Sequence, residues 1–209
     1  MFIRVPAILC ASRAHGEHGA IVRLLTAEHG LVAAYLAGAR GRTLRPLLVP
    51  GNVLDAEVTL RDNRMPSARI ELVESRGPWL TEPLPAAGIG WTATLTAAAL
   101  PENHPYPALF SALSATLNAI CHAPSARGWA LALARYEALV LRELGYGGQE
   151  SAQTLLSDGT QWPVLLDNLH KQGRAIESRL LAERRRDVMG ARAILLDRLK
   201  RISGEGNSI

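Results

Sequence analysis

The chain has 209 residues, 48% of them hydrophobic and 20% charged, and a formal net charge of +4. This composition is ordinary for a folded, soluble protein, and the length allows one large domain or two small ones. No apolar run approaches the ~20 residues that a membrane span requires. Cys10 and Cys121 are too few and too far apart for a disulfide framework or a cysteine-rich zinc site. The first residues lack the layout of a signal peptide, so we expect a cytoplasmic protein with reduced thiols.

The first 75 or so residues read as five short strands, because apolar and β-branched runs are bounded by turn-forming residues. Pro6 places the first strand at an edge or a bend, and Pro50-Gly51-Asn52 marks a turn before the fourth. The expected strands are 2–11, 20–25, 31–36, 53–60 and 68–74. Five short strands with no helical segment among them predict a small closed or partly closed barrel.

After residue 78 the chain becomes rich in Ala and Leu, and its apolar residues recur at helical spacing. The expected helices are 90–100, 105–121, 125–145, 162–171, 176–186 and 188–202. We therefore expect an α+β protein, with a barrel domain at 1–78 and an all-α domain at 79–209. A short, irregular loop without cysteine is expected at about 147–161.

The charge is unevenly distributed along the chain. Residues 1–78 carry ten basic and seven acidic side chains, residues 79–168 carry three and seven, and residues 169–209 carry ten and five. Basic ends suggest contact with a polyanion, and an acidic middle suggests packing or a protein partner. Because solvated surface charge would give the same pattern, charge alone leaves nucleic-acid binding open.

Positive charge is concentrated in a loop after the third expected strand. Between Gly38 and Arg45 the chain places three arginines and two glycines in eight residues, which predicts an exposed, flexible loop. Guanidinium groups bind phosphates through paired hydrogen bonds, so Arg40, Arg42 and Arg45 are candidates for gripping a nucleic-acid backbone. A solvated hairpin tip is the alternative.

Four further arginines on or beside the expected strands would extend this basic track, namely Arg4, Arg13, Arg23 and Arg69. Aromatic residues that could stack on bases are scarce, since the barrel half offers just Phe2 and Tyr35. The pattern therefore favours contact with the backbone over base stacking, and weak sequence preference.

One face of the 125–145 helix carries Arg135, Leu139 and Arg142 at i, i+4 and i+7, away from its apolar stripe. Two cations framing an apolar residue suit an acidic peptide with a hydrophobic end. Ordinary solvated surface is the alternative, and the residues alone favour it.

Motifs for catalysis are absent from the sequence, which has no P-loop, dinucleotide-binding turn, nucleophile elbow or Cys-x-x-Cys pair. We expect no catalytic residue, metal or cofactor. The rival hypothesis is an enzyme that uses His15, Glu17 and His18 on a metal, although a solvated loop explains these residues better. A third hypothesis is an adaptor whose barrel binds only protein.

Several short segments, none specific alone, occur in a particular order over most of residues 5–200. They are Gly16-Glu17, Leu25-Thr26-x-Glu28-x-Gly30-Leu31, Gly38-Ala39-Arg40, Leu48-Val49-Pro50-Gly51-Asn52, Leu100-Pro101-Glu102, Leu109-Phe110, Arg135-Tyr136-Glu137, Glu143-Leu144-Gly145-Tyr146-Gly147 and Gly190-Ala191-Arg192-Ala193. In this order and spacing the chain resembles RecO, a family of bacterial recombination mediators that act in gap repair.

The resemblance implies an N-terminal OB-fold barrel, a C-terminal helical domain and a non-enzymatic role in the nucleoid. Such proteins bind single- and double-stranded DNA and anneal complementary strands. They dock on the acidic, Phe-ended tail of single-stranded-DNA-binding protein, and with RecR they help to load RecA. The family's basic loop falls on Arg40, Arg42 and Arg45, and its tail-binding region falls near 135–142. A generic OB-fold adaptor without annealing activity is the alternative.

The chain departs from the family's pattern in one place. Many members carry a cysteine-bearing insertion after the Leu-Gly-Tyr-Gly segment, which sometimes binds zinc. Here residues 148–161 are short and contain no cysteine. We therefore expect no zinc, and expect contacts made through that insertion to be missing.

Overall fold

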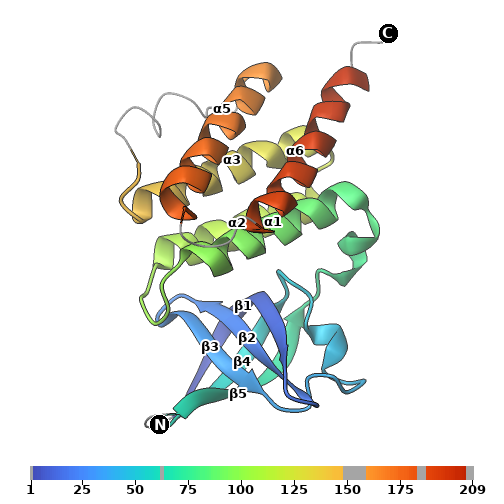
Figure 1. Ribbon diagram of the computed structural model, residues 1–209. Coiled ribbons are helices and arrows are strands. Elements are labelled where there is room, and N and C mark those ends of the chain that lie inside the picture. Colours follow the sequence, from blue (N-terminus) through green and yellow to red (C-terminus); the bar gives the residue numbers. More distant parts are fainter. Residues whose placement is uncertain (1, 62–63, 148–158, 183–186, 206–209) are drawn as a thin grey trace. The chain divides into compact units, whose positions relative to one another are not determined.

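The computed structural model describes residues 2–61, 64–147, 159–182 and 187–205, and the chain divides into two compact units (Figure 1). The first unit comprises Met1–Thr81 and Leu100–Ser111, and the second comprises Glu82–Ala99 and Ala112–Ile209. Residues 100–111 thus group with the barrel, although the sequence places them in the helical half. The domain boundary near residue 78 stays a prediction, and most of the loop expected at about 147–161 lies outside the described residues.

The first unit is a closed five-stranded barrel with the strand order β1-β2-β3-β5-β4 (Figure 1). Its strands are β1 (Phe2–His15), β2 (Gly19–Thr26), β3 (Gly30–Leu36), β4 (Val53–Arg61) and β5 (Arg64–Glu74). All neighbouring pairs are antiparallel except β3 and β5, and β4 closes the barrel by pairing with β1. This order with its single parallel pair is the OB-fold, so the expected barrel is confirmed.

Strand β1 is long because it pairs with β4 through its first half and with β2 through its second half. Pro6 pairs with Asp55 of β4, whereas the pairing with β2 begins at Ala7. The missing N–H of the proline therefore falls where β1 has one neighbour, as expected for a strand edge. Alternate residues of the strands, such as Leu24 and Val58, fill the barrel interior.

Hydrogen bonds to β1 and to the side chain of Asn52 hold the turn before β4 in place. Gly51 has a φ of +85°, and its N–H donates to the carbonyl of Leu9 over 2.8 Å. The buried side chain of Asn52 donates to the Leu47 carbonyl over 3.0 Å and accepts from the Arg76 N–H over 2.7 Å. These bonds satisfy polar groups that burial would otherwise destabilise, and they fix the end of the loop that precedes the turn.

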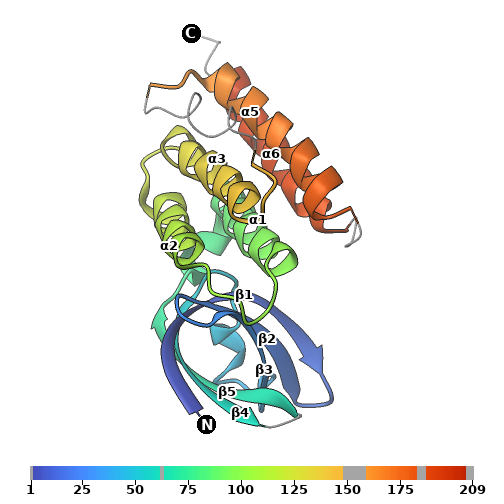
Figure 2. The ribbon, with the colours of Figure 1, turned by 90° about the vertical axis from the view of Figure 1, so that its left-hand side faces the viewer.

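The second unit is helical in the residues that the structure describes. The α-helices in the described residues are α1 (Pro83–Ala99), α2 (Pro107–His122), α3 (Ala126–Glu143), α5 (Trp162–Ala175) and α6 (Asp187–Glu205), with a π-helical turn η3 (Ile176–Leu180) after α5. Helix α1 packs against α3 and α6, and α3 packs against α5 (Figure 2). The barrel-then-helices fold class is confirmed.

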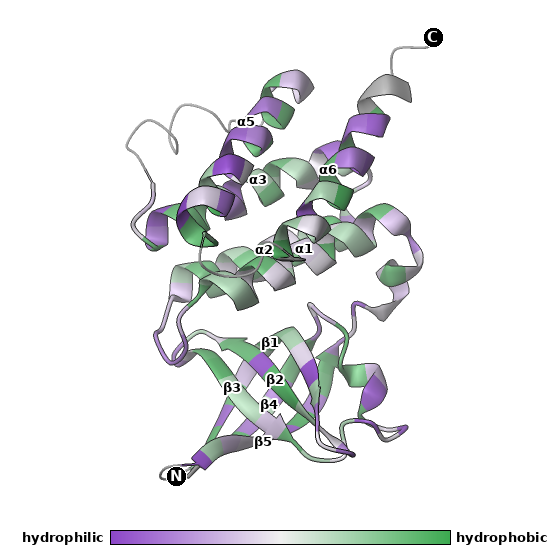
Figure 3. Ribbon diagram, viewed as in Figure 1, coloured by the Kyte–Doolittle hydropathy of each residue, from purple (hydrophilic) through white to green (hydrophobic). Residues whose placement is uncertain are grey.

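Helix α1 starts seven residues before the expected residue 90, because Pro83 and Pro85 lie in its first turn, where a missing N–H costs nothing. Figure 3 shows that α1 and α2 are predominantly hydrophobic, whereas α5 and α6 carry many hydrophilic residues. Thr92 and Thr96 are buried in α1, and their hydroxyls donate to carbonyls one turn earlier. An almost wholly buried helix has no polar face, which explains why its sequence lacks clear amphipathic periodicity.

A buried ion pair connects four helices of this unit. Arg192 of α6 donates to both carboxylate oxygens of Glu137 in α3, over 2.9 and 2.6 Å. The indole N–H of Trp91 in α1 donates to the same carboxylate over 2.7 Å, and Arg192 also donates to the Leu169 carbonyl of α5. A Cβ on Gly173 would lie 2.2 Å from the Arg192 guanidinium, so glycine makes room for it. No local pattern in the sequence predicts this network.

Candidate nucleic-acid interface and partner groove

The loop that follows β3 presents its arginines while burying its apolar residues. Ala39 is 2% exposed, and Leu44 packs against the barrel core, whereas Arg40, Arg42 and Arg45 are exposed. The predicted exposure is therefore confirmed. The alternation of inward apolar and outward basic residues makes the loop a cap on the barrel with a basic outer side.

Backbone hydrogen bonds shape this loop. The N–H of Gly41 donates to the Gly38 carbonyl over 2.8 Å, and that of Arg45 donates to the Gly41 carbonyl over 3.0 Å. Gly38 has a φ of +68°, which a residue without a side chain adopts without strain. The Arg40 N–H reaches the His18 carbonyl over 3.4 Å, in the turn between β1 and β2. The loop predicted to be flexible is thus a sequence of hydrogen-bonded turns.

The three loop arginines differ from Arg4, Arg23 and Arg76 of the barrel, which form ion pairs. Within the described ranges, no ion pair involves Arg40, Arg42 or Arg45. Arg4 by contrast lies 2.7 Å from the Asp55 carboxylate, and a hydrogen bond from this guanidinium to Asp55 raises the pKa of Arg4. The positive charge of the loop is therefore not compensated by acidic neighbours in the described residues, which suits it to an external anion.

Arg13 and Arg23 are two of the four arginines that the sequence predicts to extend the track along the strands. Arg13 is exposed in β1 and lies opposite Ile21 of β2, and Arg23 lies opposite Ala11. The Arg23 guanidinium donates to the carboxylate of Glu102 over 2.9 Å. Arg23 is therefore paired with an acidic residue of its own unit, and its role in binding DNA, like that of Arg13, stays a prediction.

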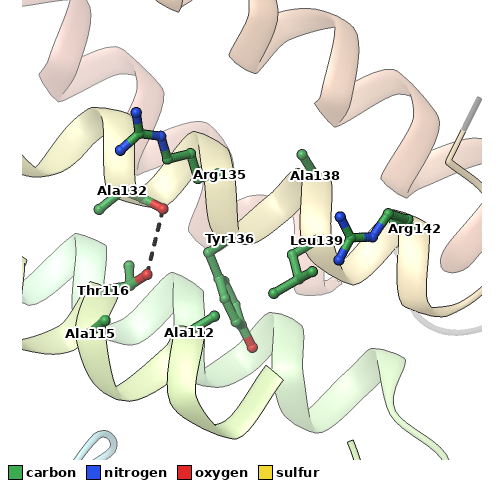
Figure 4. Close-up of a pocket in the computed structure, with 9 residues that line it drawn as sticks. All are labelled: Ala112, Ala115, Thr116, Ala132, Arg135, Tyr136, Ala138, Leu139 and Arg142. Carbon is green, nitrogen blue, oxygen red and sulfur yellow. Dashed lines mark hydrogen bonds between the residues drawn. The ribbon is translucent and has the colours of Figure 1, made fainter. Parts of the chain in front are cut away.

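A groove of about 480 Å³ lies between α2 and α3 (Figure 4). Arg135, Leu139 and Arg142 line it together, as their spacing in the sequence predicts for one helix face. Figure 4 shows the two guanidiniums on either side of Leu139 along α3. The remaining lining residues are Ala112, Ala115, Thr116, Ala132, Tyr136 and Ala138.

The groove exists because small side chains face one another across the two helices. Alanines of α2 and α3 leave the space open, and the Thr116 hydroxyl reaches the Ala132 carbonyl over 3.5 Å. Tyr136 is 1% exposed, and its hydroxyl is hydrogen-bonded to Thr96 of α1. An apolar hollow with two cations at its rim can hold an apolar side chain and an anionic chain at once.

Sequence reasoning missed the side of the groove that α2 supplies. The small residues Ala112, Ala115 and Thr116 share one face of α2 at helical spacing, which is the signal available in the sequence. Nothing in the sequence identifies the helix that this face opposes. Tyr136 is buried, yet its ring also borders the groove (Figure 4).

The rival metal site gains no geometric support. Among the described residues, no three His, Cys, Asp or Glu side chains lie close enough to hold an ion. His18 and Glu17 are both largely exposed, and the His15 ring packs edge-on to Tyr35. Burial raises the pKa of the Cys10 thiol to about 12, so this cysteine stays protonated at neutral pH and cannot act as a thiolate nucleophile. None of the described helices is both long enough and apolar enough to span a bilayer.

Comparison with known proteins identifies the same family over both halves of the chain. The family model described as "Recombination protein O N terminal" matches residues 1–76, and "Recombination protein O C terminal" matches residues 84–153. DNA repair protein RecO of Phenylobacterium zucineum (strain HLK1) is 40% identical over 160 residues, which cover 75% of this chain and 65% of the relative. DNA repair protein RecO of Ruegeria sp. (strain TM1040) is 37% identical over 151 residues, which cover 71% and 61%.

The matched segment covers less than two thirds of the length of these relatives. Nevertheless, the two family models together account for most of this chain, in the order in which the barrel and the helices follow one another. The chain belongs to the RecO family.

Proposed function

We propose that this protein acts in DNA repair as a non-catalytic mediator that binds DNA through its barrel and anneals complementary strands. The observation that carries the proposal is the loop with Arg40, Arg42 and Arg45 exposed and outside any ion pair of the described residues. Relatives named as DNA repair proteins support it. The proposal places the protein in the cytoplasm, in association with the nucleoid.

The chemistry of the loop favours the backbone of DNA over its bases. Each guanidinium can form two parallel hydrogen bonds to a phosphate, and each contact releases bound counterions. Such contacts carry no sequence information, so single- and double-stranded DNA of many sequences can bind. Weak sequence preference suits a protein that brings any two complementary strands together.

We further propose that the α2–α3 groove docks the acidic, Phe-ended tail of single-stranded-DNA-binding protein. The apolar side chain would lie against Leu139, and Arg135 and Arg142 would bind the acidic residues and the terminal carboxylate. A protein that holds DNA and this tail together can act on coated strands. Cooperation with RecR in loading RecA belongs to the same proposal and rests on family membership.

The test is binding of a fluorescent single-stranded oligonucleotide over a salt series. We expect Arg40→Glu with Arg42→Glu to weaken binding at low salt by roughly tenfold or more, since charge-assisted hydrogen bonds are lost. The slope of affinity against salt should fall by about 0.7 for each phosphate contact removed. Arg174→Glu with Arg179→Glu, at two exposed positions of the helical unit, is the matched control.

The same samples then enter an annealing assay with two complementary strands. Loss of annealing in the loop variant alone supports the mediator role. Salt-dependent binding without annealing by the unaltered protein favours the generic OB-fold adaptor. No binding by the unaltered protein at low salt contradicts the proposal as a whole.

A further inference from the structure

A second hollow lies on the barrel where β3 meets β5. The two strands pair at Tyr35 with Ser67 and at Leu36 with Ala68. A groove of about 620 Å³ opens there. This volume is within the usual range for small-molecule sites, about 300–1,000 Å³.

An aromatic ring borders this groove in a fixed position. The Tyr35 ring lies over Gly19, where an added Cβ would fall 2.3 Å from the ring. His15 packs edge-on to the same ring, with centroids 6.0 Å apart and planes at 77°. Gly19 leaves room for the ring and His15 packs against its edge, so the half-buried Tyr35 ring is held in place. It therefore offers a preorganised surface for stacking.

The part of the groove formed by β4 and β5, its polar wall, carries hydrogen-bond donors and acceptors. Glu57 and Thr59 of β4 lie opposite Arg69 and Ser67 of β5, and all four line the groove. No ion pair joins Glu57 to Arg69 among the described residues, although the two are cross-strand partners. A carboxylate, a guanidinium and two hydroxyls can accept from and donate to the edge of any nucleobase.

The groove also adjoins the basic loop. Leu44, which lines the groove, lies between Arg42 and Arg45 in the sequence. Tyr35 precedes Arg40 by five residues, in the strand that leads into the loop. A strand whose phosphates contact the loop arginines therefore has bases within reach of the groove.

We propose that this groove holds one unstacked nucleobase of single-stranded DNA, stacked on Tyr35 with its edge toward the polar wall. The inference rests on the proposed function and adds a base contact to its backbone contacts. It assigns the groove to single strands, because a paired base cannot leave its stack without the loss of its partner. The mixed donors and acceptors make the contact tolerant of sequence.

The experiment compares an oligothymidine of about 16 nucleotides with an abasic strand of the same length and charge. The unaltered protein should bind the oligothymidine at least about fivefold more tightly, as expected for one stacked base. Tyr35→Ala should abolish this preference without changing the salt slope, whereas Tyr35→Phe should retain it. Ser67→Gln, which fills the groove and leaves the ring in place, should reduce the preference as well.

Equal binding of the two strands by the unaltered protein overturns the stacking site and leaves the backbone contacts intact. A preference that survives in both Tyr35→Ala and Ser67→Gln also overturns it. If neither strand binds at low salt, the proposed function itself fails. Thermal unfolding of each variant shows that the barrel is folded, and Ser67→Gln keeps the test decisive should Tyr35→Ala prove unstable.

Discussion

The basic loop of the barrel and the α2–α3 groove of the helical unit both present arginines, but in different surroundings. In the loop, Arg40 and Arg42 are exposed beside the exposed residues Gly41 and Thr43. In the groove, Arg135 and Arg142 flank Leu139 above a hollow lined by alanines and a tyrosine (Figure 4). Cations alone suit a phosphate backbone, whereas cations around an apolar hollow suit a peptide that is acidic and hydrophobic at once.

The two regions also differ in what holds them in place. The loop is fixed by hydrogen bonds within a few residues, from Gly38 to Arg45. The groove depends on the packing of α2 against α3, and α3 also contributes buried residues to the helical core. Arg135 lines the groove, and the next residue, Tyr136, lines it while being almost fully buried. Glu137 follows and forms the buried ion pair with Arg192. Damage to the core should therefore affect the groove and spare the loop.

The largest expected effect comes from Glu137→Ala. This change leaves the buried guanidinium of Arg192 and the indole N–H of Trp91 without their shared acceptor. Removing one partner of a buried ion pair typically lowers the free energy of unfolding by about 3–5 kcal/mol. Thermal unfolding should show early loss of helical signal, with loss of tail-peptide binding and retention of DNA binding by the barrel.

The matched control for Glu137→Ala is Lys171→Ala, which removes the exposed ion pair with Asp167 on α5. This variant should unfold like the unaltered protein, because solvent screens an exposed pair. Unchanged unfolding of Glu137→Ala would show that the buried pair is not what holds α3 to α6. Parallel loss of DNA binding would contradict the independence of the two regions.

The next effect concerns the groove alone. Arg135→Glu reverses one rim charge and should weaken binding of an acidic peptide with a C-terminal Phe by about tenfold or more, since a charge-assisted hydrogen bond becomes a repulsion. Titration calorimetry with this peptide measures the change, and a peptide ending in Ala tests the apolar hollow. DNA affinity should not change by more than about twofold, because the loop arginines are untouched.

Arg179→Glu, at an exposed position of η3, is the control for a general charge effect. If Arg135→Glu and Arg179→Glu bind the peptide equally well, the groove is not the docking site. If Arg135→Glu also weakens DNA binding, the groove and the loop do not bind their partners independently.

The parts of these regions that sequence could predict are those built from neighbours along the chain. The loop follows from the density of Gly and Arg after a strand, and the α3 half of the groove follows from the i, i+4, i+7 spacing of Arg135, Leu139 and Arg142. The five strands follow from the sequence because alternation and turn residues are local signals. The barrel's closure required the pairing of β1 with β4, which is a long-range contact.

Contacts between distant segments explain what sequence reasoning missed. Arg192 lies four residues after Val188 and three before Leu195, so a charge in an apolar stripe was visible as an anomaly. Its partner Glu137 is a buried residue of another helix, α3, and no local pattern in the sequence joins the two. Likewise, the groove needs α2 to face α3, and the β3–β5 groove needs strands that are neighbours only in the barrel.

The smallest expected effect concerns Arg23, which differs from the loop arginines in having an ion pair with Glu102. Glu102→Gln removes the acidic partner without changing the shape of the side chain. If Arg23 belongs to the DNA track, single-strand affinity should rise about two- to threefold, since the exchange of an exposed pair is worth ~0.2–1 kcal/mol. Arg23→Gln should lower affinity, and the double variant should match Arg23→Gln. Unchanged affinity in all three would remove Arg23 from the interface and leave Arg13 and the loop arginines as the predicted DNA contacts of the barrel.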